Sequence, residues 1–219
     1  MVYFMDTEPT ICSLEEYLQN PCGTLSIPYW KAKTLAIPDS VRVIHHSNWI
    51  GQYCDFQRFF RVKHDLKQLA PIDFDYDTIA IDSQSKQLCE MINASYKHED
   101  IAIREEDVLR WKNHETFRED LCIYINVNDG VMAASGIAEY DEVCREGTIE
   151  WVQVLPEYRR RGYGEKIVTV LLHRLKNIGA EFVTASGNLD NACNPLALYR
   201  RCGFTGDDVW YVCHSLKTV

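Results

Sequence analysis

A glycine turn between an apolar strand and a long amphipathic helix is the part of the sequence best suited to bind a ligand. The turn reads Arg159-Arg160-Arg161-Gly162-Tyr163-Gly164. Its glycines allow the backbone to approach a ligand closely, and the next helix presents its first N–H groups at the same point. Free N–H groups, the helix dipole and three arginines together form an anion site that would fit a pyrophosphate. The alternative interpretation of the arginine run is a solvated charged surface.

The residues that follow the turn exclude two common phosphate-binding loops. A mononucleotide P-loop requires Lys-Ser or Lys-Thr after its last glycine, but this sequence has Glu165-Lys166 there. The dinucleotide fingerprint requires a third glycine at the position that Ile167 occupies. The turn therefore belongs to another kind of anion site.

Two motifs in the second half of the chain resemble those of the GCN5-related N-acetyltransferases (GNAT). Arg159-x-x-Gly162-x-Gly164, after a strand that ends at Pro156, is similar to the acyl-CoA loop of this family. The run Leu198-Tyr199-Arg200-Arg201-Cys202-Gly203-Phe204 looks like its closing LYxxxGF signature. The resemblance covers residues 76–219 and implies a mixed α/β sheet with the GNAT-type acyl-CoA N-acyltransferase fold.

Acyl transfer from a thioester to an amine needs a base for the amine, a donor for the oxyanion and an acid for the leaving thiolate. The resemblance implies that Tyr199 is the general acid, because the tyrosine of this signature points at the sulfur of coenzyme A. It also implies Glu150 as the candidate base, since many members place a glutamate in this strand. On a regular strand, Glu150 would share a face with Thr148 and Val152. The structural alternatives are a packed aromatic ring and a salt-bridged carboxylate.

The same resemblance assigns candidate contacts to acetyl-CoA. The oxyanion donor is expected among the backbone N–H groups of Val152, Gln153 and Val154, beside a bulge that parts this strand from strand 181–185. The phosphates are expected on the backbone of residues 159–164 and on the side chains of Arg159 or Arg160. Asn191 and Asn194 flank the position where many members carry an asparagine, so both are candidate cofactor contacts.

Nine cysteines and seven histidines raise the questions of a metal and of a covalent mechanism. No cysteines are spaced as C-x-x-C, no H-E-x-x-H occurs, and His45-His46 is the only histidine cluster. We therefore expect buried, reduced thiols and no metal. Cys193 and Cys202 lie near the predicted site, but no histidine stands beside either in the sequence. Direct attack on the thioester is therefore favoured over a cysteine acyl-enzyme.

Composition and charge narrow the functional classes. Hydrophobic residues make up 46% and charged residues 25% of the chain, as in ordinary globular proteins. The formal net charge of -9 argues against nucleic acid or an anionic membrane as a partner. No apolar run approaches the roughly 20 residues that span a bilayer. The first ten residues lack the basic and apolar regions of a signal peptide, so a cytoplasmic location is expected.

Hydrophobic periodicity predicts the elements that position these residues. The predicted strands are 78–81, 121–127, 131–140, 151–155 and 181–185, and the predicted helices are 83–96, 103–111, 163–178 and one that Asn194 caps. A tight turn is predicted at Asn128-Asp129-Gly130. This order mixes an antiparallel meander with a βαβ unit.

Residues 1–75 differ from the rest of the sequence. Ser13 is a plausible cap of a short helix, three prolines break the chain after it, and aromatic residues are frequent. A helix is predicted over residues 58–69. We predict an N-terminal extension over 1–75 packed on a main domain over 76–219. The extension forms either one wall of the acceptor pocket or a purely structural layer.

These observations predict an acetyl-CoA-dependent N-acetyltransferase that acts on a primary amine by direct attack in a ternary complex. A small-molecule acceptor is favoured over a protein because the aromatic-rich region 25–60 suits a closed pocket. The sequence leaves a homodimer open. One alternative function is a catalytically silent acyl-CoA-binding or sensing module. Another is a nucleotide-binding regulator, which would bind ATP or NAD in competition with coenzyme A.

Overall fold

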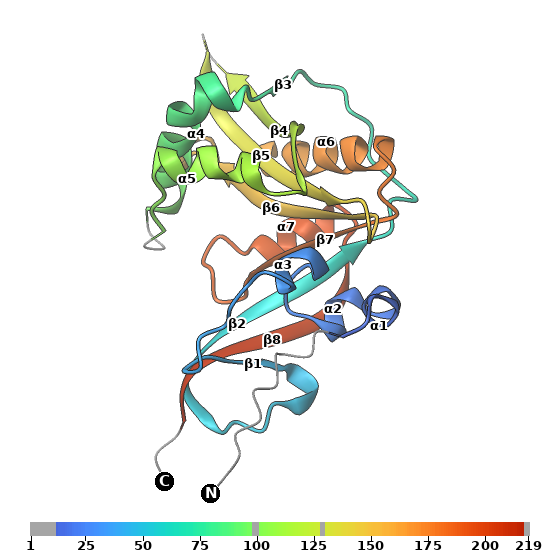
Figure 1. The fold of residues 1–219 in the computed structure, drawn as a ribbon. Helices are drawn as coiled ribbons and strands as arrows, with labels where there is room; N and C mark the ends of the chain where they lie inside the picture. The colour runs from blue at the N-terminus through green and yellow to red at the C-terminus, as the bar shows by residue number, and fades with distance from the viewer. Residues whose placement is uncertain (1–11, 98–100, 128–129, 217–219) are drawn as a thin grey trace, which may run out of the picture.

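The protein forms one eight-stranded sheet with helices on both faces (Figure 1). The computed structural model describes residues 12–97, 101–127 and 130–216. The strand order across the sheet is β1-β8-β2-β7-β6-β5-β4-β3. Within the described ranges, no helix is both long and apolar enough to cross a membrane.

The strands, in chain order, are β1 (Arg42–His45), β2 (Tyr53–His64), β3 (Asp77–Thr78), β4 (Phe117–Val127), β5 (Val131–Asp141), β6 (Glu146–Val154), β7 (Phe182–Asn188) and β8 (Thr205–Leu216). The α-helices are α1 (Leu14–Gln19), α2 (Pro21–Thr24), α3 (Tyr29–Ala32), α4 (Ile81–Tyr96), α5 (Glu105–Arg110), α6 (Tyr163–Asn177) and α7 (Pro195–Arg201). Three short 3-10 helices are η1 (His46–Asn48), η2 (Trp111–Asn113) and η3 (Pro156–Tyr158).

Strands β3 to β6 form an antiparallel meander, and β6 and β7 are the one parallel pair, joined by α6. The helix packs directly on the backbone of the sheet. A Cβ atom on Gly136 would lie 2.3 Å from Ile167, and one on Gly147 would lie 2.7 Å from Leu175. Glycine is therefore required where the helix touches β5 and β6. This arrangement confirms the mixed α/β fold predicted from the sequence.

Strand β2 overturns the helix predicted over residues 58–69. The strand runs to His64 and pairs antiparallel with β7 on one side and β8 on the other. Phe60 and Val62 pack into the core beneath α6, while Arg61 between them is also buried. From Phe60 to Val62 the strand is buried on both faces, so this stretch shows no polar and apolar alternation and the sequence pattern was misleading.

The division into an extension over 1–75 and a main domain over 76–219 stays a prediction. The structure adds that β2 lies inside the sheet and joins β8 to β7 (Figure 1). The first and last parts of the described chain thus share one set of backbone hydrogen bonds. We infer that β8 depends on β2 for its link to the rest of the sheet.

Most other predicted elements are present with shifted ends. The helix predicted over 83–96 begins earlier, at Ile81, so the strand predicted over 78–81 is shortened to β3. The cap at Ser13 is confirmed, because its hydroxyl accepts from the Glu16 N–H at 3.2 Å. The turn predicted at Asn128-Asp129-Gly130 lies outside the described residues except for its glycine, which has a φ of 97°.

A buried ion pair fastens α1 and α2 to the sheet. Nη2 of Arg61 on β2 lies 3.1 Å from Oε1 of Glu146 on β6, and both side chains are at most 1% exposed. The hydroxyl groups of Tyr17 (2.7 Å) and Thr184 also donate to this carboxylate. Arg61 donates in addition to the carbonyl oxygen of Pro21 at 3.1 Å. One guanidinium therefore joins α1, the start of α2, β2, β6 and, through Thr184, β7.

We expect Arg61→Met to lower the free energy of unfolding by about 3–5 kcal/mol, because it leaves the Glu146 carboxylate buried without its cation. Urea denaturation followed by tryptophan fluorescence would measure this loss. The matched control is Arg58→Met on the same strand, since Arg58 pairs with Asp190 at the surface. The control should lose at most about 1 kcal/mol. Equal losses in the two variants would show that the buried pair has no special role.

Candidate active site

The parting of β6 and β7 is the centre of the candidate site. These strands pair in parallel from Glu146 opposite Phe182 to Ile149 opposite Ala185, and their pairing stops there. Beyond this point, β6 continues beside β5 and β7 continues beside β2. Strand β6 thus stays paired with β5 and β7 stays paired with β2. The edges of β6 and β7 that face each other are no longer paired. Backbone groups on these edges are therefore left for a ligand or for side chains.

Glu150 is the extra residue of a β-bulge at this parting. Ile137 pairs with Trp151 and Ala138 with Ile149, so Glu150 has no partner on β5. The bulge implied by the family resemblance is thus present. It also overturns the expectation that Glu150 shares a face with Val152. Val152 packs toward the α6 side, whereas Glu150 turns to α3 on the other side.

The backbone of Val152 and Val154 faces the unpaired edge of β6. The Leu155 N–H bonds to the Ala133 carbonyl on β5, and successive residues of a strand point to alternate sides. The Tyr96 hydroxyl donates to the Val152 carbonyl at 2.9 Å, so this edge is already used by a neighbouring side chain. The N–H groups of Val152 and Val154 point the same way and are suited to stabilise an oxyanion.

Gln153, the third candidate in this stretch, points into the protein. It is 2% exposed, and its side-chain amide donates to Ser135 on β5. Its backbone faces β5 as well, because it alternates with Val152 and Val154. A cofactor contact through Gln153 stays a prediction that this orientation does not favour.

The glycine turn ends at the N-terminus of α6, as the sequence predicted. Gly162 is the N-cap residue with a φ of 82°, and no side chain caps the helix. Lys166 is the first residue whose N–H bonds back to Gly162, at 3.1 Å. The N–H groups of the three preceding residues therefore lack a helical partner. Together with the helix dipole, they give the geometry that an anion site requires.

Arg159 is held by protein groups rather than left to solvent. Its Nε donates to the Val154 carbonyl at 3.1 Å, and its other nitrogens contact the carbonyl oxygen of Ser95 and the sulfur of Cys193. The side chain thereby connects the end of β6 with α4 and with the loop before α7. A phosphate contact through Arg159 would require these contacts to open.

The other two arginines of the turn are exposed. Arg161 lies over the ring of Tyr158, with its guanidinium carbon 5.3 Å from the ring centroid. Arg160 has a φ of 62°, and within the described ranges no hydrogen bond or ion pair holds its side chain. Of the three arginines, Arg160 is therefore best placed to reach a bound phosphate.

Asn191 and Asn194 shape the loop that leads into α7. Asn194 has a φ of 51°, and its side chain accepts from the Ala197 N–H at 3.2 Å, which confirms the predicted helix cap. The Asn191 side chain accepts from the Cys193 N–H at 2.7 Å. These contacts give both residues a structural role, and their role in cofactor binding stays a prediction.

Tyr199 lies on α7, on the α6 side of the sheet. Its ring packs against Phe60 at 5.9 Å between centroids, and the residue is 6% exposed. Burial is the main cause that raises the pKa of Tyr199 far above its ordinary value, and the charges of Tyr96, Cys202 and Glu150 add to it. The phenol therefore stays protonated at neutral pH, as a general acid must.

Glu150 and Tyr199 approach the parting of β6 and β7 from opposite faces of the sheet. Glu150 reaches toward α3, which lies on the near side of the strands in Figure 1. Tyr199 belongs to the core beneath α6. An acyl group between the two strands would have a proton donor on one side and a carboxylate on the other. The sequence named both residues, and their catalytic roles stay predictions.

Lys31 of α3 is the partner of Glu150 that the sequence did not indicate. Its Nζ lies 2.7 Å from Oε2 of Glu150. The side chains are 32% and 18% exposed, so this ion pair is partly shielded from solvent. The two residues are 119 positions apart in the chain, and no local pattern connects them.

Aromatic residues adjoin both members of this ion pair in the chain: Trp30 precedes Lys31, whose Nζ lies 5.4 Å from the Trp30 ring centroid, and Trp151 follows Glu150. Trp151 lies next to Tyr96 and Trp111, with ring centroids 5.7 Å and 5.9 Å away. Trp30 of α3 packs against His114 at 5.6 Å. These residues come from both parts of the chain. Residues of the predicted extension thus reach this face of the sheet, and their role as a wall of an acceptor pocket stays a prediction.

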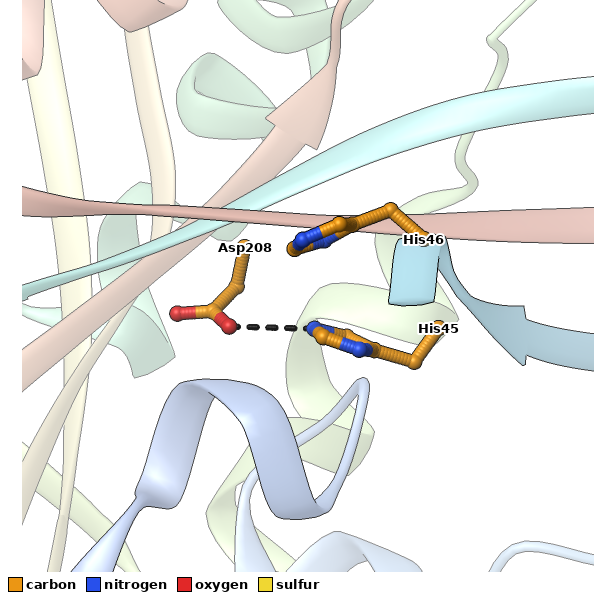
Figure 2. Close-up of side chains that lie close together, drawn as sticks. All are labelled: His45, His46 and Asp208. Carbon is orange, nitrogen blue, oxygen red and sulfur yellow. Dashed lines mark hydrogen bonds and ion pairs between the residues drawn. The ribbon is translucent and has the colours of Figure 1, made fainter. Parts of the chain in front are cut away.

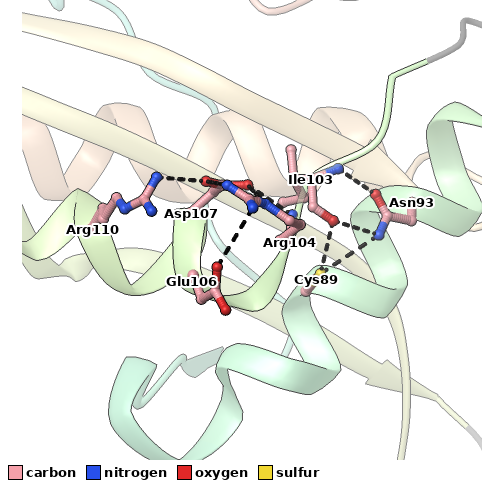
Figure 3. A network of polar contacts seen from close by, with 7 residues as sticks. All are labelled: Cys89, Asn93, Ile103, Arg104, Glu106, Asp107 and Arg110. Atoms are coloured by element: carbon pink, nitrogen blue, oxygen red, sulfur yellow. Dashed lines mark hydrogen bonds and ion pairs between the residues drawn. The ribbon is translucent and has the colours of Figure 1, made fainter.

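A polar network fixes α4 and α5 relative to each other (Figure 3). The side chain of Asn93 exchanges two hydrogen bonds with the backbone of Ile103, at 2.8 Å and 2.9 Å. Asp107 pairs with Arg104 and Arg110 at the start and end of α5. The network holds the helices that carry Tyr96 and lead to Trp111, and so positions the aromatic face of the site.

A separate cluster of His45, His46 and Asp208 lies at β1 and β8 (Figure 2). Its possible ligand atoms lie within 4.8 Å of one another. However, both rings accept a backbone N–H at Nδ1, from Ser47 at 3.4 Å and from Val209 at 3.2 Å. Nδ1 of His45 also lies 2.9 Å from Oγ of Ser47, so protein groups already contact both Nδ1 atoms. His45 instead pairs through Nε2 with Asp208 at 3.0 Å.

Three solved structures with a similar fold are named as acetyltransferases. A GCN5-related N-acetyltransferase from Sphaerobacter thermophilus has a TM-score of 0.63 and 16% identity, over 73% of this chain and 51% of that one. A GNAT acetyltransferase from Colwellia psychrerythraea has a TM-score of 0.62 and 14% identity, over 80% and 64%. The ribosomal-protein-S18-alanine N-acetyltransferase from Escherichia coli has a TM-score of 0.51 and 16% identity, over 66% and 95%.

At these identities the likeness establishes the fold alone. The chain spans 51% of the Sphaerobacter protein and 64% of the Colwellia protein, less than two thirds of either. A comparison with curated protein sequences found no match.

The family itself is established by a sequence model. The model of the acetyltransferase (GNAT) family matches residues 85–204, which is more than half of the 219 residues. The matched range runs from α4 through the parting of β6 and β7 to the end of α7. The chain therefore belongs to the acetyltransferase (GNAT) family.

Proposed function

We propose that the protein transfers the acetyl group of acetyl-CoA to a primary amine by direct attack of the amine on the thioester. Membership of the GNAT family supports acyl transfer from coenzyme A. The observation that carries the finer proposal is the position of Glu150 and Tyr199 on opposite sides of the parted strands. A base and an acid on two sides of one thioester are what direct transfer needs.

In this proposal, acetyl-CoA binds from the side of α6 and α7. Its diphosphate lies on the free N–H groups at the start of α6, with Arg160 as the nearby cation. Its extended arm follows the unpaired edge of β6, where Val152 and Val154 face outward. This path leads from the helix N-terminus toward the bulge at Glu150, where the strands part.

The amine enters from the opposite face, where α3, α4 and η2 contribute side chains. Glu150 accepts a proton from the amine, whose lone pair then attacks the carbonyl carbon. An N–H group of the β6 edge stabilises the oxyanion. Tyr199 supplies a proton to the leaving thiolate. The aromatic residues next to Lys31 and Glu150 in the chain, Trp30 and Trp151, support a small-molecule amine as the acceptor.

One observation favours a catalytically silent acyl-CoA-binding module as the second candidate. The carboxylate proposed as the base already has a cation, Lys31, at 2.7 Å. A base in an ion pair accepts a proton less readily than a free one. The two functions differ in turnover, which is therefore the measurement that separates them.

We expect Glu150→Gln and Tyr199→Phe each to slow amine-dependent thiol release by about 10² or more, because each removes a proton-transfer group. Acetyl-CoA affinity should stay unchanged in both variants. Glu142→Gln is the matched control, since Glu142 is exposed in the turn between β5 and β6, at the opposite end of β6 from the parting. Wild-type protein that binds acetyl-CoA but turns over with no amine in a broad panel would support the silent module instead.

The turn before α6 has its own test. We expect Gly162→Ala to weaken acetyl-CoA binding by about tenfold, because a side chain at this positive φ costs roughly 1–2 kcal/mol and shifts the N–H groups. Gly130→Ala is the matched control, because Gly130 also has a positive φ and open space around it but lies in the β4–β5 hairpin. Calorimetric titration should show a loss of affinity in the first variant alone. Equal affinities of the Gly162→Ala and Gly130→Ala variants for acetyl-CoA would show that the turn is not part of the cofactor site.

A cysteine acyl-enzyme is the alternative mechanism that thiol substitution tests. Burial is the main cause that raises the pKa of Cys202 to about 12, so its thiol is almost fully protonated at neutral pH. We expect Cys202→Ala and Cys193→Ala to keep turnover within about a factor of two. A thioester-linked acetyl group on either cysteine, detected by mass spectrometry, would contradict direct attack.

A further inference from the structure

We propose that Lys31 is an intramolecular acceptor, so that the acetyl group of bound acetyl-CoA is transferred to Nζ of Lys31 in the same chain. This inference rests on the proposed N-acetyltransferase function and names one substrate of that same site. It makes Lys31 a site of covalent modification.

The ammonium of Lys31 stands where an acceptor amine must stand. A base has to lie within about 2.6–3.2 Å of the nitrogen whose proton it takes. Nζ of Lys31 lies 2.7 Å from Oε2 of Glu150. Within the described ranges, this is the one hydrogen bond of the Glu150 carboxylate and of the Lys31 ammonium. No other group competes for the proton between them.

Two aromatic residues directly before Lys31 fix its segment to the protein. Tyr29 packs against Tyr17 at 5.3 Å, and Tyr17 is tied into the buried Arg61 network. Trp30 packs against His114 at 5.6 Å. These two anchors restrict where the Lys31 side chain can go. A tethered amine of this kind has a high effective concentration at the reacting carbon.

Lys33 is a neighbour that lacks these features. It is exposed, and its ammonium lies over the ring of Tyr29 at 4.5 Å. Within the described part of the chain, no carboxylate pairs with it. Lys33 therefore reports how fast acetyl-CoA modifies an ordinary lysine of the same segment without help from a base.

The step is balanced with acetyl-CoA as the co-reactant. The Lys31 ammonium gives one proton to Glu150, which releases it to solvent, and the neutral Nζ then forms a bond to the carbonyl carbon of the thioester. Glu150 takes the second proton from Nζ, and through solvent this proton replaces the one that Tyr199 gives up, so that the net release is one proton. The carbon–sulfur bond breaks, and the thiolate leaves with a proton from Tyr199. The products are an amide on Lys31 and free coenzyme A. Acetylation removes the charge of Lys31, so Glu150 loses its ion pair and becomes available to an external amine.

The test is incubation of the full chain with acetyl-CoA alone, followed by digestion and mass spectrometry of the peptides that contain Lys31 and Lys33. We expect Lys31 to be acetylated at least about tenfold faster than Lys33. The rate at Lys31 should fall by about 10² in Glu150→Gln. Lys33→Arg should leave the Lys31 rate unchanged, and Lys31→Arg should remove the fast reaction. Equal rates at the two lysines, insensitive to Glu150→Gln, would show spontaneous chemistry and overturn the proposal.

Transfer within one chain predicts a first-order rate that does not change when the protein is diluted. A mixture of wild-type protein with an isotope-labelled Glu150→Gln variant should leave the variant unmodified at Lys31. Fast modification of the variant would show transfer between chains and would overturn the assignment to the same chain.

The same preparations, assayed with external amines, separate this inference from the proposed function. Turnover of external amines with Lys31 unmodified would overturn the inference and leave the function intact. Binding of acetyl-CoA with neither turnover nor modification would overturn both. Modification of Lys31 that depends on Glu150 supports both.

Discussion

The buried pair of Arg61 and Glu146 is the interaction on which the arrangement of the protein depends. Burying either charge alone would cost several kcal/mol, so each is tolerated inside the protein only while the other is present. The pair joins β2 to β6, and Tyr17 and the carbonyl of Pro21 complete the hydrogen bonds of the guanidinium. It therefore fixes α1 and α2 on the face of the sheet where α3 and the acceptor site lie.

Strand β6 serves two purposes along its length. Its first half, from Glu146 to Ile149, is paired on both sides and carries the buried anchor. Its second half begins with the bulge at Glu150 and leaves one edge unpaired. Unpaired backbone costs stability unless something satisfies it, and here Tyr96 and Arg159 use the carbonyl groups. The N–H groups of the same edge are left for the proposed oxyanion contact. The half of β6 that is paired on both sides thus supports the half that carries the proposed chemistry.

The N-terminal segment connects these two features. It is anchored at the tightly paired half of β6 through Tyr17 and reaches the bulged half through Lys31. Residues from the beginning of the chain thus lie on the proposed acceptor face, while α6 and α7 lie on the proposed cofactor face. Because the Lys31 ammonium pairs with the proposed base Glu150, the first amine available to the proposed site belongs to the protein itself. Lys31 would then be a substrate of the site as well as the partner of Glu150.

The sequence by itself determined the features that depend on neighbours in the chain. The turn at residues 159–164, the helix after it, the cap at Asn194 and the position of Tyr199 follow from glycines, caps and periodicity, which act over a few residues. Only the tertiary structure decided that residues 58–64 belong to a central strand, because the stretch Phe60–Val62 is buried on both faces and carries no alternation. It alone also decided the bulge at Glu150 and the pairing with Lys31. Both depend on which strands meet in the sheet, and such contacts between distant residues leave no local pattern.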